Sequence, residues 1–205
     1  MTTEEVYHYL VSGSRPNDCD EFDGHVLGSV LALAFYEAQT GQSSIGGAVG
    51  LDRPDLSRLL DKFFPHAAAL FVKDDEAAPT RSADEITLID LLNQCGTSGS
   101  PIEALLAPMI ARRAQRPNHL WQDLGLQDRG ELSELMTKHF APLAARNNKD
   151  MKWKKFLYRT ICRDTGYALC VAPSCGECAD FDHCFNEETG ESFLARIRRD
   201  VEASA

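Results

Sequence analysis

The sequence predicts an all-α protein, a single compact multi-helix domain that carries a C-terminal cysteine-rich loop. Its apolar residues recur with the three-to-four-residue spacing of helices rather than with the alternation of strands. Helix-capping residues precede several of these periodic segments, and no internal repeat divides the chain. The 205 residues, 43% hydrophobic and 25% charged, are enough to enclose a sizeable core and have the composition of a folded protein.

The first 65 residues contain signals for two helices. Helical periodicity predicts a helix over residues 22–40, and a Gly-rich loop is expected over residues 41–50. Asp52, with Pro54 two positions later, is typical of a helix start, and Pro65 should end that helix.

Further helices are predicted by capping boxes, in which a capping residue is followed three positions later by Glu. The three pairs are Ser82 with Glu85, Ser100 with Glu103, and Asp128 with Glu131. A polar loop is expected over residues 73–81, a helix over 149–163, and a last short helix over 191–202. We expect residues 1–21 to be a flexible N-terminal segment and residues 22–205 to form the domain.

Charge and hydropathy exclude two kinds of partner. The formal net charge of -10 at pH 7 disfavours binding to nucleic acid and to anionic membrane surfaces. The most apolar stretch, residues 26–36, is about half of the roughly 20 residues that span a bilayer. The acidic N-terminus lacks the features of a secretory signal, so we expect a cytoplasmic protein.

The strongest chemical signal is a cysteine motif in the segment 162–184. Its spacing is Cys170-x4-Cys175-x2-Cys178-x5-Cys184, which suits iron-sulfur ligation because the corners of such a cluster lie close together and each iron takes a thiolate. Structural zinc, two disulfides or unligated thiols are the alternatives. Zinc sites commonly use two separated Cys pairs, and the cytosol keeps thiols reduced.

The helix expected over residues 149–163 has two distinct faces. Trp153 and Phe156 belong to an apolar face, whereas a basic stripe of four residues occupies another: Lys152, Lys155, Arg159 and Arg163. The stripe ends just before the cysteine motif, so we interpret it as an anion or cluster binding surface. The alternative is a solvated helix face.

Four other residues are candidates for additional metal ligands: Cys162, His119, His139 and His183. For Cys162 the alternative is a small buried apolar residue, and for the histidines it is a packing or surface role. Trp121 and Trp153 are expected to anchor the core.

Five segments together resemble the NifQ family: HLWQDLGL at 119–126, HFAPL at 139–143, MKWKKFLYR at 151–159, APSC at 172–175 and CF at 184–185. The resemblance covers roughly residues 110–190. One departure is Asn186, where the family pattern has Gly; Asn also tolerates a left-handed backbone.

The resemblance implies a protein of nitrogen fixation that binds a cluster of molybdenum, iron and sulfur and, with molybdate as the metal source, donates molybdenum for the iron-molybdenum cofactor. The cluster ligands would be Cys170, Cys175, Cys178 and Cys184, and the partners the nitrogenase iron protein NifH and the scaffold NifE-NifN. Such a protein would be a carrier and not an enzyme. An iron-sulfur electron carrier and a zinc-stapled interaction module remain alternatives.

Overall fold

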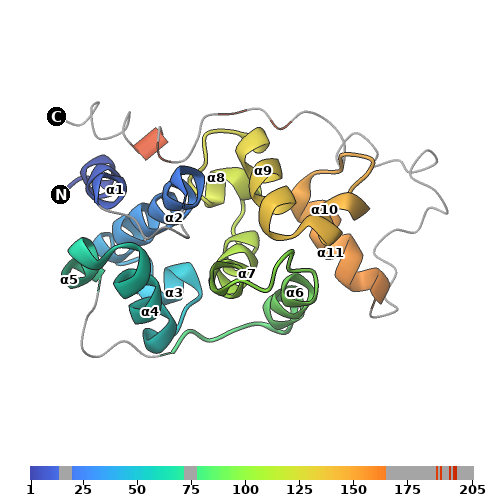
Figure 1. The fold of residues 1–205 in the computed structure, drawn as a ribbon, viewed down its shortest axis with the longest axis horizontal. Helices are drawn as coiled ribbons and strands as arrows, with labels where there is room; N and C mark the ends of the chain where they lie inside the picture. Colours follow the sequence, from blue (N-terminus) through green and yellow to red (C-terminus); the bar gives the residue numbers. More distant parts are fainter. Residues whose placement is uncertain are drawn as a thin grey trace.

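The computed structural model describes residues 1–13, 20–71 and 78–164, together with Glu188, Gly190, Leu194, Arg196 and Ile197. This part of the chain contains α-helices, one 3-10 helix and no strand, which confirms the predicted all-α class (Figure 1). The elements are α1 (Thr3–Ser12), α2 (Glu21–Gln39), α3 (Ile45–Val49), α4 (Arg53–Phe63), η1 (Pro65–Ala67), α5 (Ala68–Phe71), α6 (Ala83–Gln94), α7 (Pro101–Ala114), α8 (Leu120–Asp123), α9 (Arg129–His139), α10 (Ala141–Arg146) and α11 (Trp153–Asp164).

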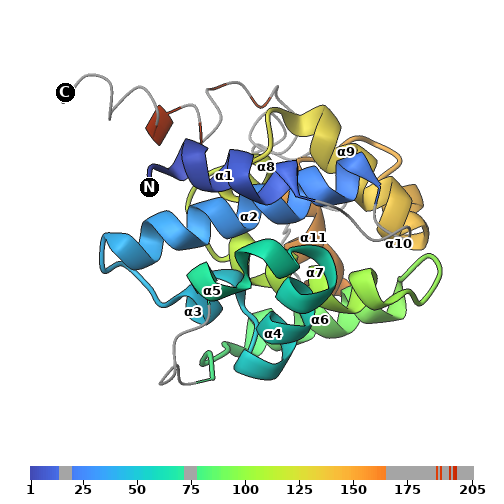
Figure 2. The same ribbon diagram turned by 60° about the vertical axis from the view of Figure 1, so that its left-hand side comes forward.

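Helix α2 is the longest described element and packs against several others. Its residues from Val26 to Ala34 are almost completely buried, because α1 and α3 pack against it (Figure 2). Helices α6 and α7 pack on each other, and α9 packs on α10. Buried apolar side chains from α1 through α11 form one continuous cluster, as expected for a single domain. None of the described helices is long and apolar enough to cross a membrane.

The N-terminal segment differs from the expectation of flexibility over residues 1–21. Residues Thr3–Ser12 form α1, which Thr2 and Glu5 begin with a capping box, and Val6 and Leu10 of this helix are buried against α2. Two apolar residues four positions apart are a weak sequence signal, and only the packing against α2 reveals their role.

The Gly-rich segment over residues 41–50 also differs, because it contains the short helix α3. Ser44 caps this helix by accepting a hydrogen bond from the Gly47 N–H, and Gly50 ends it with φ +75°. A Cβ atom at Gly50 would lie 2.8 Å from the Pro108 carbonyl oxygen, so the absence of a side chain allows close packing on α7.

The capping predictions are confirmed at Ser82 and Asp128, which accept hydrogen bonds from the Glu85 and Glu131 N–H groups. At Ser100 the helix starts as expected, but the serine side chain makes no capping hydrogen bond. Glu103 accepts hydrogen bonds from the N–H groups of Ser98 and Gly99 instead, so this carboxylate orders the loop before α7.

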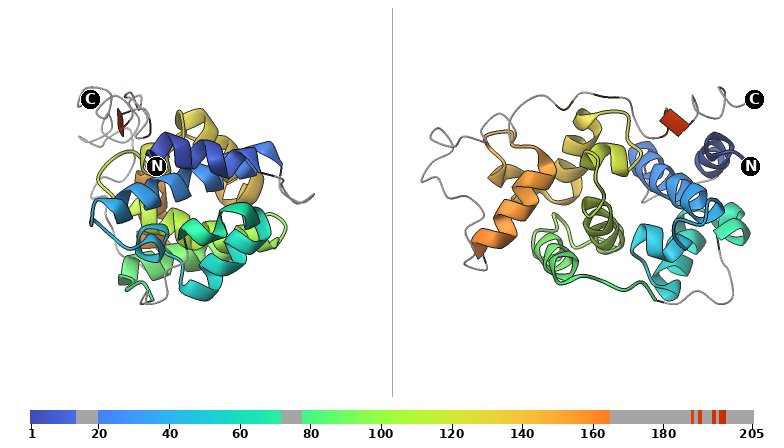
Figure 3. Two further views of the ribbon diagram at one scale, coloured as in Figure 1. Left: turned by 90° about the vertical axis from the view of Figure 1, so that its left-hand side faces the viewer. Right: turned by 180° about the vertical axis from the view of Figure 1, so that it is seen from behind.

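Helix α11 begins at Trp153, four residues later than the expected residue 149. Its apolar face is confirmed, since Trp153, Phe156 and Leu157 are 4%, 8% and 0% exposed. Trp153 Nε1 donates to Ser133 Oγ at 3.1 Å, which fixes α11 against α9. Seen from behind, α11 runs beside α9 and α10, on the opposite side of the molecule from α1 and α5 (Figure 3).

Candidate functional site

The predicted cluster ligands Cys170, Cys175, Cys178 and Cys184, together with His183, lie outside the described residues, as does most of the helix expected over 191–202. The two flanks of the cysteine motif are described. Helix α11 ends at Asp164 before the motif, and Glu188 follows it. Among the described residues, no group of three or more His, Cys, Asp or Glu side chains is arranged to hold a metal ion.

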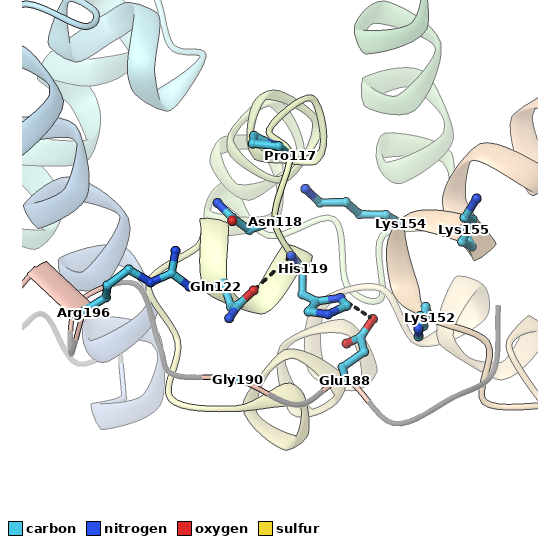
Figure 4. Close-up of a pocket in the computed structure, with 10 residues that line it drawn as sticks. All are labelled: Pro117, Asn118, His119, Gln122, Lys152, Lys154, Lys155, Glu188, Gly190 and Arg196. Atoms are coloured by element: carbon cyan, nitrogen blue, oxygen red, sulfur yellow. Dashed lines mark hydrogen bonds and ion pairs between the residues drawn. The ribbon is translucent and has the colours of Figure 1, made fainter. Parts of the chain in front are cut away.

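A pocket of about 460 Å³ lies between the start of α8, the start of α11 and residues of the C-terminal segment; we call it the α8–α11 pocket (Figure 4). Its lining consists almost entirely of polar and charged residues: Pro117, Asn118, His119, Gln122, Lys152, Lys154, Lys155, Glu188, Gly190 and Arg196. Three predicted residues therefore meet in one place, His119 from one sequence segment and Lys152 and Lys155 from another.

The wall formed by residues 117–122 is shaped by hydrogen bonds at the start of α8. Gln122 Oε1 accepts from the His119 N–H at 3.2 Å, and Asn118 Nδ2 donates to Asp123 Oδ1 at 2.9 Å. These bonds satisfy a backbone N–H at the start of a very short helix and hold His119 at the pocket.

Lys154 joins this wall to α11. Its Nζ donates to Asp123 Oδ2 at 2.5 Å and to the Arg116 carbonyl oxygen at 2.6 Å. Burial lowers the pKa of Lys154, and the hydrogen bond and charge of Asp123 oppose that shift. Lys154 is therefore a structural cation whose charge is largely balanced by Asp123.

Lys152 and Lys155 have a different environment. Lys155 is exposed and Lys152 half-buried, and the side chain of neither forms a hydrogen bond or ion pair with another residue in the described ranges. Figure 4 shows the two lysines on one side of the pocket, with Arg196 on the opposite side and its guanidinium directed toward Gln122. The described lining residues include four cationic side chains and one carboxylate, which together carry a formal charge of +3 with His119 neutral.

Glu188 supplies the carboxylate among the lining residues that the structure describes. Its Oε1 lies 3.3 Å from His119 Nδ1, an ion pair when the imidazole is protonated, and its side chain is only 3% exposed. Its other oxygen, Oε2, is buried and accepts no hydrogen bond from the described residues. Glu188 follows the cysteine motif in the sequence and lines the same pocket as residues at the start of α11.

The remaining candidate residues lie elsewhere. His139 is buried in α9, where its Nε2 lies 2.7 Å from Asp23 Oδ1, and it lines a separate hollow of about 250 Å³ beside Glu103 and Lys138. Cys162 is half-buried and packs against the core. Arg159 is half-buried and has an interaction partner, and the side chain of Arg163 lies outside the described residues.

Several pocket residues were not anticipated from the sequence: Asn118, Gln122, Lys154, Glu188 and Arg196. Lys154 lies between Lys152 and Lys155, so the run of basic residues could have suggested it. Glu188 and Arg196 carry no local signal, because only the return of the chain to α11 places them in the pocket.

The fold and site define an all-α protein in which a cationic pocket lies next to the flanks of a cysteine-rich segment. A family profile described as NifQ matches residues 26–186. The chain is 41% identical to a protein NifQ homolog of Sinorhizobium fredii over 86% of this chain and 78% of that protein. It is 41% identical to protein NifQ of Rhodobacter capsulatus, over 78% of this chain and 87% of that protein.

A third relative, protein NifQ of Azotobacter vinelandii, is 33% identical over 72% of this chain and 82% of that protein. The chain belongs to the NifQ family. The match begins at residue 26, so the family similarity extends well beyond the segment 110–190 that contains the five motifs. Membership implies a role in nitrogen fixation and in molybdenum handling. No solved structure matches the chain.

Proposed function

We propose that this protein is a cytoplasmic carrier, not an enzyme, which binds a molybdenum-iron-sulfur cluster as cargo and donates molybdenum to the synthesis of the iron-molybdenum cofactor. NifH and NifE-NifN are the proposed recipients. Family membership carries the proposal, because the match includes all four cysteines of the motif. Thiolates are the ligands that iron-sulfur clusters require.

The α8–α11 pocket supports this proposal electrostatically. The protein has a net charge of -10, so molybdate, a dianion, is repelled by the molecule as a whole and needs a local cationic site. Glu188 follows Cys184 by four positions, and an extended chain spans at most about 3.6 Å per residue. The pocket is thus within about 14 Å of the last proposed ligand along the chain, a short path for molybdenum.

The first test is the metal content of the full-length protein purified without oxygen. Iron with molybdenum, and the broad brown absorbance of an iron-sulfur cluster, support the carrier. Iron without molybdenum would favour the electron carrier, and colourless protein with zinc the stapled interaction module; either result would contradict the proposal.

The ligand assignment predicts the effect of single cysteine substitutions. Replacing Cys170, Cys175, Cys178 or Cys184 with Ala should lower bound iron, because each removal leaves one metal corner without its thiolate. Cys95→Ala is the matched control, since Cys95 is half-buried between α6 and α7 and should not change the iron content. Iron measured on anaerobically reconstituted variants checks the prediction, and equal iron in all five variants would refute it.

A further inference from the structure

The α8–α11 pocket concentrates cations that come from separate parts of the chain. Lys152 directly precedes α11 and Lys155 lies in its first turn, whereas Arg196 belongs to the C-terminal segment, and all three line the same hollow (Figure 4). A solvated helix face would present only the charges of one helix. Convergence of charges from different segments, in a protein of net charge -10, indicates attraction of an anion to this point.

The described lining residues offer hydrogen-bond donors to an anion. They contribute charged and amide groups and include no Leu, Ile, Val, Phe, Tyr or Trp. Asn118 and Gln122 add amide groups to the lysine and arginine donors. A small inorganic oxyanion, which offers acceptor oxygens in several directions, matches such a lining.

The volume indicates that the anion keeps part of its water shell. A pocket of about 460 Å³ has room for roughly fifteen waters at about 30 Å³ each, far more than one small oxyanion displaces. The buried Glu188 Oε2 has no hydrogen-bond donor among the described residues, and a retained water would supply one. Binding through waters is weak and reversible, as delivery to a neighbouring site requires.

We propose that the α8–α11 pocket is a receptor for a small tetrahedral oxyanion of the molybdate class, and that it holds this anion before any cluster chemistry and independently of the cysteine motif. Lys152, Lys155 and Arg196 supply the attraction, and Asn118 and Gln122 supply neutral donors. Glu188 lowers the local positive charge, which keeps the anion exchangeable. The choice of molybdate over other oxyanions rests on the proposed function.

The test is calorimetric titration of molybdate into the metal-free, full-length protein under reducing conditions. We expect binding of one anion per chain, weakened at least fivefold in Lys152→Gln/Lys155→Gln, because two of the four cationic side chains among the described lining residues lose their charge. Glu188→Gln should bind more tightly than the wild type, since it removes the one carboxylate among the described lining residues. Tungstate, sulfate and phosphate are titrated in parallel to measure selectivity.

The matched control is Arg58→Gln/Lys62→Gln, which removes two cations of α4, outside the pocket lining. It changes the net charge by the same amount and should alter molybdate affinity less than twofold. Circular dichroism of each variant establishes that it is folded. The proposal that the α8–α11 pocket binds the anion would be overturned if the folded wild type bound no molybdate. It would also be overturned if both double variants weakened molybdate binding equally.

The same proteins separate this inference from the proposed function. In one outcome, the anaerobically reconstituted protein contains normal iron and molybdenum, but the metal-free protein binds no molybdate. The proposed anion site is then refuted and the carrier function stands. Conversely, molybdate can bind as expected while no cluster is taken up, in which case the carrier function fails and the receptor stands.

Discussion

Glu37 is the centre of a buried ion cluster that joins α2 to the end of α7. Its Oε1 accepts from Arg113 Nη1 and its Oε2 from Arg116 Nη2, each at 2.5 Å, and the Glu37 and Arg113 side chains are 6% and 1% exposed. Burial lowers the pKa of Arg113, and the charge of Glu37 opposes that shift. The buried charge of the Arg113 guanidinium is therefore compensated by this carboxylate.

We predict that Glu37→Gln lowers the free energy of unfolding by about 3 to 5 kcal/mol, because an amide of the same shape leaves the Arg113 charge buried without compensation. A domain of this kind has a total stability of about 5 to 15 kcal/mol, so the variant should fold but unfold early. For a chain of this size each kcal/mol corresponds to about 2 to 4 °C, which gives a fall in Tm of roughly 6 to 20 °C.

Urea and thermal unfolding of the metal-free protein measure the effect. Arg58→Gln is the control, because Arg58 pairs with Asp55 at an exposed position, 74% accessible, where an ion pair contributes less than about 1 kcal/mol. Adding Arg113→Met to Glu37→Gln should recover at least half of the loss, since the uncompensated charge is removed as well. A loss below about 1 kcal/mol in Glu37→Gln would show that water reaches the cluster and refute the reasoning.

Two further predictions concern the fold. Gly125 has φ +76°, and a Cβ atom added there would lie 3.1 Å from Leu33 Cδ1 and 3.2 Å from the Ser29 carbonyl oxygen. Gly125→Ala should therefore lower the free energy of unfolding in urea by about 1 to 3 kcal/mol. Gly99→Ala is the control and should cost less, because Gly99 has a similar φ of +69° but open space around its Cβ position. Burial raises the pKa of Glu85, and the charge of Arg112 opposes this shift. The protonated Glu85 side chain therefore contributes a stabilisation that is fully present below the unfolded-state pKa of about 4.3. This stabilisation is lost as pH rises through the folded-state pKa. Between about pH 5 and pH 7 the free energy of unfolding should therefore fall more, or rise less, in the wild type than in Glu85→Gln. Equal changes in the two proteins would contradict this prediction.

The helical class and most helix starts follow from local sequence signals. Asp52, Ser82 and Asp128 each accept a hydrogen bond from the backbone N–H three residues later, an interaction that depends only on residues close together in sequence. The apolar face of α11 follows from its spacing in the same way. The cysteine motif and the family resemblance likewise need only the order of residues.

The tertiary structure decided which of these residues meet. His119 and His139 are equivalent as sequence candidates, yet one lines a cationic pocket and the other is buried against Asp23. Lys152, Lys154 and Lys155 have the same charge, yet Asp123 balances only Lys154 among the described contacts. These differences arise because partners such as Asp123 and Glu188 are distant in sequence, and the strength of a charge interaction depends on separation in space and on burial, which only packing determines.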